Sequence, residues 1–270
     1  MPRREDAMYH LFDHLGAPPA SPGPTPAPAP AARLRRRTVT SWPAFFGALG
    51  GEYDRFAFGG AALTRVAEGE TKLLADAIGA GDGRGLLDVG AGTGRFSTVA
   101  RDQGWQVTAF DAAPEMLDVI RQRLPEVRTV EGSLGAPLPF ENAAFDAVIA
   151  MRVVKYVPDA QAALAELARV LAPGGSLLFD LANGRSLARF GYPGGTISFV
   201  SPRAVAPLLR SVGLLPVGTY AGPRLPHPVY RRARGTRSAT ALASVERALD
   251  AVLLPGTGAR NLIVHAVRSR

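Results

Sequence analysis

Short apolar segments alternate with amphipathic segments over residues 85–180, and this alternation restricts the possible folds more than any other feature of the chain. Runs of Val, Leu, Ile and Phe predict buried strands, whereas apolar residues that recur every three to four positions predict helices. Strands separated by helices of this length favour a parallel sheet covered on both faces. We expect strands at 85–89, 106–110, 127–130, 145–150 and 175–180, and helices at 95–103, 114–123 and 159–171.

Further elements are expected on both sides of this alternating region. A helical pattern runs from about Leu63 to Ile78, before glycines interrupt it. After the alternating region, the pattern predicts a helix at 202–212, a strand at 214–220 and a last strand at 261–267. A long excursion, 222–258, separates the last two strands and contains the basic stretch YRRARGTR and an amphipathic helix.

The first 37 residues differ in composition from the rest of the chain. Residues 17–32 are almost only Pro, Ala, Gly, Ser and Thr, and five residues from Arg33 to Arg37 follow as RLRRR. Such a segment cannot bury a core and is typical of an extended, disordered tail. We therefore expect residues 1–37 to lie outside the fold and one domain to occupy residues 38–270.

Composition restricts the environment and the partners of the chain. The chain has no cysteine, no secretory pattern at its start and no apolar run near the ~20 residues of a membrane-spanning helix, so we expect a cytoplasmic protein without a transmembrane segment. The formal charge of +8 comes from arginine, since Lys72 and Lys155 are the only lysines. This charge attracts nucleic acid, anionic lipid and acidic metabolites alike. Because no cluster of metal-ligating residues is visible, we expect no metal.

The stretch LLDVGAGTGRFS, residues 86–97, places Gly90, Gly92 and Gly94 between a strand and a helix. Such a turn lets a ligand approach the backbone, with the helix N-terminal amides directed at it. The dinucleotide pattern G-x-G-x-x-G would require a third glycine where the chain has Arg95. Asp88, immediately before the turn, suits a pyrophosphate poorly and favours a cationic or amino-acid-bearing ligand.

Three further stretches follow in order: VTAFDAAPEML (107–117), VEGSLGAPLPFENAAFDAVIAMRVVKYVPD (130–159) and LARVLAPGGSLLFDLAN (167–183). Together with the glycine-rich turn, this series resembles class I S-adenosylmethionine-dependent methyltransferases over roughly residues 52–220. Asp111 lies 21 positions after Gly90, close to the ~20 expected of an acid that binds a ribose. The resemblance implies a Rossmann-like, doubly wound, mostly parallel seven-stranded α/β sheet with helices on both faces and an antiparallel last strand.

The resemblance also implies a pocket for S-adenosylmethionine, whose product is S-adenosylhomocysteine. The glycines would admit the cofactor, and Asp111 would hold the ribose. Asp88 would help orient the loop and bind the methionyl end, directly or through water. Two departures from the family affect this pocket: Ser133 stands where an acid is frequent, and Lys155-Tyr156 stands where a histidine pair is frequent. The implied cofactor residues are Asp88, Gly90, Ala91, Gly92, Gly94, Asp111, Ala112, Met116, Ser133, Leu134, Met151 and Arg152.

The aromatic cluster at 42–58, within a possible lid at 38–62, has two interpretations. It is either one amphipathic helix packed on the domain or, as in relatives, a lid over the cofactor. Tyr53 is the residue of this segment expected to reach the site, because it follows the Gly50-Gly51 break. No catalytic base is assigned, and the candidates are Tyr53, Tyr156 and His227.

The expected function is transfer of a methyl group to an O, N or C atom of a small-molecule acceptor, such as a secondary metabolite, a lipid or a quinone. Acceptor specificity is expected in 181–200 and 222–258, where Arg189, Tyr192 and Tyr230 are candidate contacts. Two alternatives stay open: an RNA methyltransferase that uses the basic surface, and a cofactor-binding relative without catalysis. The oligomeric state is left open.

Overall fold

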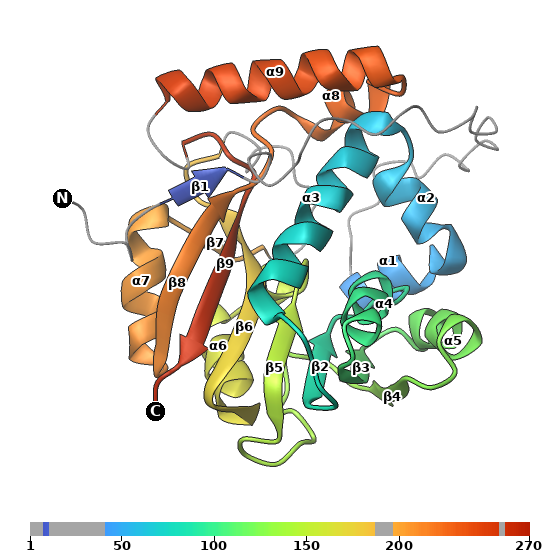
Figure 1. Cartoon of the computed structure of the whole chain (residues 1–270), viewed down its shortest axis with the longest axis vertical. Helices are drawn as coiled ribbons and strands as arrows, with labels where there is room; N and C mark the ends of the chain where they lie inside the picture. Colours follow the sequence, from blue (N-terminus) through green and yellow to red (C-terminus); the bar gives the residue numbers. More distant parts are fainter. Residues whose placement is uncertain (1–7, 11–40, 187–196, 254–256) are drawn as a thin grey trace.

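The computed structural model describes residues 8–10, 41–186, 197–253 and 257–270, in which one nine-stranded sheet is covered by helices on both faces (Figure 1). Along the sheet the order is β1-β8-β9-β6-β5-β2-β3-β4, and β7 pairs with β6 beside this path. The strands are β1 (Met8–His10), β2 (Gly85–Val89), β3 (Gln106–Asp111), β4 (Arg128–Glu131), β5 (Phe145–Ala150), β6 (Leu171–Asn183), β7 (Phe199–Val200), β8 (Leu214–Ala221) and β9 (Asn261–Arg268).

Strand directions confirm the fold class expected from the sequence. The pairs from β4 to β6 are all parallel, whereas β9 runs antiparallel to both of its neighbours, β6 and β8. The seven expected strands are present, with β6 longer than the predicted 175–180 because it begins at Leu171. Two short strands, β1 and β7, extend the sheet beyond the expectation.

Strand β1 corrects the expectation that all of residues 1–37 lie outside the fold. Met8–His10 pairs in parallel with Thr219–Ala221 of β8, so that this short stretch extends the edge of the sheet. The pairing supplies backbone hydrogen bonds that composition does not indicate. The Pro- and Ala-rich segment at 17–32 and Arg33–Arg37 lie outside the described residues.

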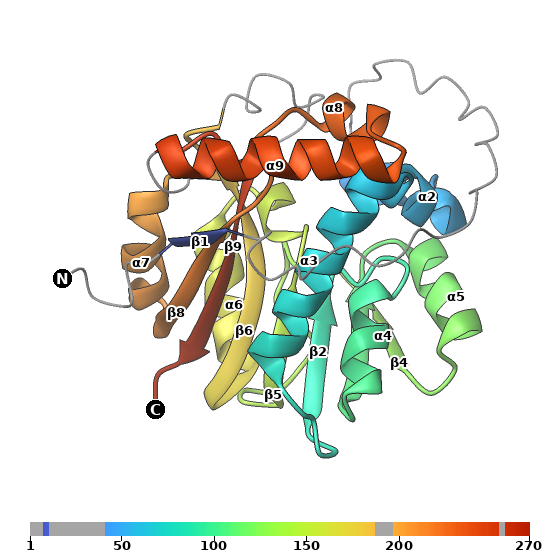
Figure 2. The same cartoon turned by 45° about the horizontal axis from the view of Figure 1, so that its top comes forward.

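Helices on the two faces of the sheet bury two separate apolar clusters. Helices α3, α4 and α5 cover one face, and α6 and α7 cover the other (Figure 1). Figure 2 shows α9 lying across the end of α3, so that the excursion between β8 and β9 extends the first face. The bounds are α1 (Trp42–Gly47), η3 (Gly50–Glu52), α2 (Tyr53–Phe58), α3 (Ala61–Ile78), α4 (Arg95–Asp102), α5 (Pro114–Arg123), η4 (Val154–Tyr156), α6 (Ala160–Val170), α7 (Pro202–Ser211), α8 (His227–Arg232) and α9 (Thr236–Val252).

Strand β2 lies where the order of the strands along the sheet reverses. Its neighbours are β3 on one side and β5 on the other, and all three strands are parallel. Because their apolar side chains are buried under helices on both faces, the strands are held in register and their carboxyl ends meet at one edge. In open α/β sheets this reversal point is where ligands bind. None of the helices in the described part of the chain is long and apolar enough to cross a membrane.

Candidate functional site

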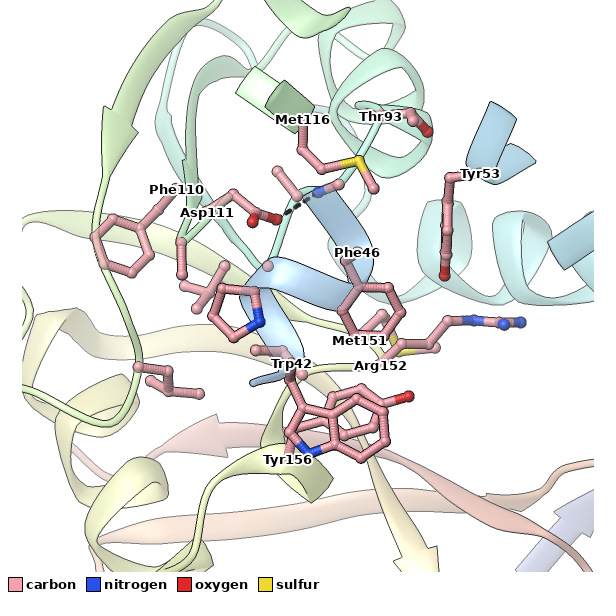
Figure 3. A pocket seen from close by; sticks show the side chains of 18 of the residues that line it. Trp42, Phe46, Tyr53, Thr93, Phe110, Asp111, Met116, Met151, Arg152 and Tyr156 are labelled. Carbon is pink, nitrogen blue, oxygen red and sulfur yellow. Dashed lines mark hydrogen bonds between the residues drawn. The ribbon is translucent and has the colours of Figure 1, made fainter. Parts of the chain in front are cut away.

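A pocket opens at the carboxyl edge of β2, β3 and β5, and three kinds of wall enclose it (Figure 3). The glycine-rich turn after β2 forms one wall, the ends of β3 and β5 form another, and helices α1 and α2 form the third. The space between these walls, counted out to the open mouth and including solvent there, is about 1050 Å³. The pocket is therefore open to a ligand from solvent.

The turn after β2 presents bare backbone to this pocket. Gly90 and Gly92 have φ angles of 69° and 56°, in the left-handed region that favours glycine. A Cβ atom added at Gly90 would lie 2.7 Å from the Cβ of Val153, whereas one added at Gly92 would meet open space. Gly90 therefore allows the turn to pack closely on the residues after β5, and Gly92 leaves room on the pocket side.

Asp111 ends β3 with its carboxylate held against this turn. One carboxylate oxygen accepts a hydrogen bond of 2.8 Å from the backbone N–H of Gly92 (Figure 3). The other accepts one of 2.9 Å from the backbone N–H of Ala113. Burial raises the pKa of Asp111, and the amide donors act in the opposite direction. The carboxylate lines the pocket and retains lone pairs that can accept hydrogen bonds from a bound hydroxyl group.

Asp88 differs from Asp111 in position, because it does not line the pocket. Its side chain is 1% exposed and accepts a hydrogen bond of 2.7 Å from the hydroxyl of Ser97 in α4. Burial raises the pKa of Asp88 to about 6, partly offset by the bond from Ser97. In this geometry Asp88 ties the strand to the helix on either side of the turn and acts on the pocket through the turn.

Replacing Asp88 with asparagine is expected to remove a pH-dependent loss of stability. Because the folded-state pKa lies above the ordinary value of 3.8, the folded chain holds a proton that the unfolded chain releases. The stability due to this proton is complete below about pH 4 and is lost as pH rises through about 6. The Asp88→Asn variant should therefore gain about 2–3 kcal/mol relative to the parent chain between pH 4 and pH 7.

Urea denaturation at several pH values between 4 and 7 measures this gain. The exposed Asp118 gives the matched control, since its side chain is 62% exposed and pairs with Arg121 on the surface. Asp118→Asn should follow the parent chain at every pH. An Asp88→Asn variant whose difference from the parent is constant across the pH range would contradict the assignment.

The remaining predicted cofactor residues fall into two groups. Gly94 does not line the pocket: it begins α4 in a left-handed conformation with its Cα packed near Ile120. The others all line the pocket, namely Ala91, Ala112, Met116, Ser133, Leu134, Met151 and Arg152.

Two of the three candidate catalytic residues line the pocket. Tyr53 and Tyr156 line the pocket, whereas His227, at the start of α8, does not. Burial lowers the pKa of His227 to about 4, and the charges of Arg260, Arg231 and Arg152 lower it in the same direction. An imidazole of such low basicity makes a poor proton acceptor at neutral pH.

Of the three candidate acceptor contacts, one is described by the structure and two lie outside the described residues. Tyr230 is buried and donates its hydroxyl hydrogen bond to Glu246 of α9, so it belongs to the interior of the excursion. Arg189 and Tyr192 lie outside the described residues. Of these three side chains, only Tyr230 is described, and it does not line the pocket.

Aromatic side chains of the N-terminal helices form the wall opposite the turn. Trp42 lies with its ring centroid 4.4 Å from that of Tyr156, and Phe46 packs on both rings. Asp54 fastens this wall to the body of the domain, because its carboxylate accepts hydrogen bonds from Thr93 at 2.6 Å and from Arg123 at 2.9 Å. The sequence indicated the aromatic cluster but not this attachment, which joins residues 39 and 69 positions apart.

A buried acid below the pocket was not predicted. Glu70 is 2% exposed and accepts hydrogen bonds from the guanidinium groups of Arg95 at 2.7 Å and Arg152 at 2.7 and 2.9 Å. Burial acts to raise the pKa of Glu70, but the two arginines outweigh it and lower the pKa below its ordinary value. One signal was available in the sequence: Glu70 interrupts the apolar face of its helix between Val66 and Leu73.

Comparison with known proteins finds similarity to methyltransferases. A family model described as a methyltransferase domain matches residues 87–179. Malonyl-[acyl-carrier protein] O-methyltransferase of Serratia marcescens is 45% identical over 109 residues, which are 40% of this chain and 42% of the relative. Demethylmenaquinone methyltransferase of Renibacterium salmoninarum is 41% identical over 107 residues, 40% of this chain and 45% of the relative.

The match to these curated relatives spans less than half of their length. A solved structure extends the likeness of the fold to most of the chain. The S-adenosylmethionine dependent methyltransferase of Mesorhizobium loti superposes with a TM-score of 0.57 at 17% identity, over 75% of this chain and 98% of that one. At this identity the likeness concerns the arrangement of helices and strands.

Proposed function

We propose that this chain, which has the fold of class I S-adenosylmethionine-dependent methyltransferases and carries their methyltransferase domain at residues 87–179, transfers a methyl group to a small-molecule acceptor. The observation that carries the proposal is the pairing of two features at one pocket. A side-chain-free turn at Gly90 and Gly92 faces the carboxylate of Asp111 across the carboxyl edge of the sheet. This arrangement suits a ligand with a ribose and an extended amino-acid part.

The described residues fit S-adenosylmethionine chemically. Asp111 would accept hydrogen bonds from the ribose hydroxyls, and Met116 and Leu134 offer apolar surface to the adenine. Ser133 lines the same part of the pocket with a hydroxyl group, in place of the acid frequent in the family. When bound, S-adenosylmethionine supplies an electrophilic methyl group on a sulfonium. The protein then has to hold the acceptor in line with that methyl group and exclude water.

The aromatic wall is suited to excluding water. We propose that α1 and α2 act as a lid, with Trp42, Phe46 and Tyr156 covering the acceptor end of the pocket. The ion pair of Asp54 with Arg123 and its hydrogen bond from Thr93 hold this lid against the glycine-rich turn. Binding in the turn and closure of the lid are therefore mechanically connected.

The described pocket lining contains no histidine or lysine and no free carboxylate that could serve as a base. Asp54 is already bonded to Thr93 and Arg123, and Asp111 to two backbone amides. A hydroxyl or carbon acceptor usually needs a positioned base, whereas an ionised oxygen or a neutral amine does not. The lining therefore favours an acceptor that arrives with its nucleophilic lone pair available.

A small molecule is the acceptor class best supported. The two curated relatives are named for a malonyl group on a carrier protein and for demethylmenaquinone, and the acceptor end of the pocket is closed by aromatic rings. The basic stretch at 230–237, which an RNA substrate could use, lies on α8 and the start of α9, away from the pocket lining. A cysteine-free chain is suited to a reducing compartment, and we propose the cytoplasm.

Calorimetric titration of the full chain tests the proposal. S-adenosylmethionine and S-adenosylhomocysteine should both bind with one site, while NAD should give no signal. Incubation with candidate acceptors, followed by mass spectrometry, should then detect a product heavier by one methylene. Failure of a folded sample to bind either sulfur compound would refute the proposal, and binding without any transfer would favour a cofactor-binding relative without catalysis.

A further inference from the structure

Arg152 has an unusual backbone conformation at the acceptor end of the pocket. Its φ angle is 64°, in the left-handed region that non-glycine residues seldom adopt. The buried carboxylate of Asp180, in β6, accepts a hydrogen bond from the backbone N–H of Arg152 and holds it there. Strained positions of this kind cluster at binding and catalytic sites, because the surrounding structure must stabilise them.

Glu70 divides its hydrogen bonds between two arginines that differ in what they have left to donate. Arg95 donates its hydrogen bonds to groups within the fold. Besides Glu70, it donates to the carbonyl of Ala67 and the hydroxyl of Thr71. Its guanidinium also stacks on Phe58 and Phe96, with its central carbon 4.5 and 4.0 Å from the ring centroids. Arg95 is therefore a structural cation.

Arg152 retains donors on the pocket side. Only its Nη2 bonds to Glu70, and among the described residues its buried Nε has no hydrogen-bond partner. The side chain is 29% exposed, whereas that of Glu70 is 2% exposed. Figure 3 shows Arg152 and Tyr53 on the same side of the pocket. The Nη1 group of Arg152, which Glu70 does not use, can donate a charge-assisted hydrogen bond to a bound carboxylate.

One carboxylate is shared between Arg152 and a second arginine. Glu70 pairs with both Arg95 and Arg152, whereas Lys155 donates to Asp180 at 3.0 Å and forms a separate pair. Of the carboxylates in the pocket lining, Asp54 is paired with Arg123, and Asp111 is bonded to two backbone amides. A partly buried guanidinium that shares its carboxylate can gain stabilisation from a second anion.

We infer that the acceptor binds as a carboxylate, with Arg152 as its anchor and the rings of Trp42, Phe46 and Tyr156 against its apolar body. This inference rests on the proposed function. It also agrees with a described lining that has no histidine, lysine or free carboxylate, because an acceptor carboxylate is already ionised at neutral pH and needs no base.

The carboxylate at Arg152 could come from a second source, the methionyl end of the cofactor, and the test separates the two. Binding of S-adenosylhomocysteine is compared with binding of 5′-methylthioadenosine, which lacks the methionyl carboxylate. Benzoate, phenyl phosphate and the neutral benzamide are then titrated into the chain saturated with S-adenosylhomocysteine, and ligand-observed NMR measures their affinities. The proteins are the parent chain, Arg152→Gln, Arg152→Lys and the surface control Arg121→Gln.

Benzoate should bind the parent chain and Arg121→Gln in preference to benzamide. The affinity for benzoate should fall about 10- to 100-fold in Arg152→Gln. In Arg152→Lys it should lie between those of the parent chain and Arg152→Gln, because lysine keeps the charge but lacks the planar guanidinium. S-adenosylhomocysteine should bind all four proteins alike. Because Glu70 keeps Arg95 as a partner in Arg152→Gln, we expect this variant to fold, and a thermal melt verifies it.

Three results would overturn the inference. Weaker binding of S-adenosylhomocysteine, but not of 5′-methylthioadenosine, in Arg152→Gln would assign the arginine to the cofactor. Equal binding of benzoate in the parent chain and in Arg152→Gln, or no binding to the parent chain, would remove the anchor. Binding of phenyl phosphate without binding of benzoate would show that the anchor holds a phosphate and not a carboxylate. Failure of the parent chain to bind S-adenosylhomocysteine would instead refute the proposed function.

Discussion

Replacing Asp111 with alanine is expected to weaken the binding of S-adenosylhomocysteine by about 100-fold or more. The proposed role of the carboxylate is to accept hydrogen bonds from both ribose hydroxyls, and bonds to a charged group contribute about 1.5–3 kcal/mol each. The change also removes the acceptor for the N–H groups of Gly92 and Ala113, which loosens the turn that faces the ligand. Calorimetric titration measures the loss.

Asp111→Asn separates the two effects. Asparagine keeps one carbonyl oxygen for the turn but loses the charge, so this variant should bind with an affinity between those of the parent chain and Asp111→Ala. Asp118→Ala, at an exposed position on α5, is the matched surface control and should bind normally. Parent-like affinity in a folded Asp111→Ala would remove Asp111 from the site.

Replacing Glu70 with glutamine is expected to destabilise the fold by about 3 kcal/mol. Glutamine has nearly the same shape, but it leaves Arg95 and Arg152 close together with no carboxylate between them. Removal of one partner from a buried charge cluster is costly because the remaining charges are uncompensated. Urea denaturation at neutral pH measures the loss as a lower midpoint.

A double-mutant cycle tests the electrostatic origin of this loss. In the Glu70→Gln, Arg152→Gln protein, Arg95 is the one member of this group of three side chains that remains charged. This protein should therefore be more stable than the sum of the two single changes predicts. Glu126→Gln is the control, because the pair of Glu126 with Arg101 is exposed and such pairs contribute about 0–1 kcal/mol. A parent-like urea midpoint for Glu70→Gln would show that the cluster does not stabilise the fold.

The same cluster predicts the direction of the pH effect at Glu70. Because its pKa is lowered in the folded chain, the stabilisation is present above the ordinary carboxyl pKa and is lost as pH falls below it. Asp88 acts in the opposite direction, since its raised pKa makes stability fall as pH rises toward about 6. Two buried acids of one domain thus have opposite pH dependence because only Glu70 has cationic partners at hydrogen-bond distance.

Local pattern was enough to predict most of the helices and strands. The strands at 85–89 and 145–150 and the helix at 114–123 were predicted with the bounds that the structure has. In these segments the apolar period, the prolines and the glycines all favour the same structure. The strand at Met8–His10 was missed because its pairing with β8 depends on a partner more than 200 residues away.

Site residues were predictable where they follow directly from a strand end. Gly90, Gly92 and Asp111 adjoin the carboxyl ends of β2 and β3, and parallel pairing brings those ends together. Asp88 was predicted to help orient the loop and to bind the methionyl end of the cofactor directly or through water. Its side chain lies outside the pocket lining and bonds to Ser97, because alternation along the strand directs it at α4.

The sequence by itself determined the sheet, its covering helices and the glycine-rich turn, because these depend on periodicity and on the conformations that neighbouring residues allow. The tertiary structure alone decided which charges meet. Glu70, Arg95 and Asp180 come from α3, α4 and β6, and Arg152 comes from the turn after β5. Their hydrogen bonds depend on how α3 packs beside α4 and β6. Burial and contact across elements, which set both the shared ion pair and the strained backbone of Arg152, arise only when the helices close on the sheet.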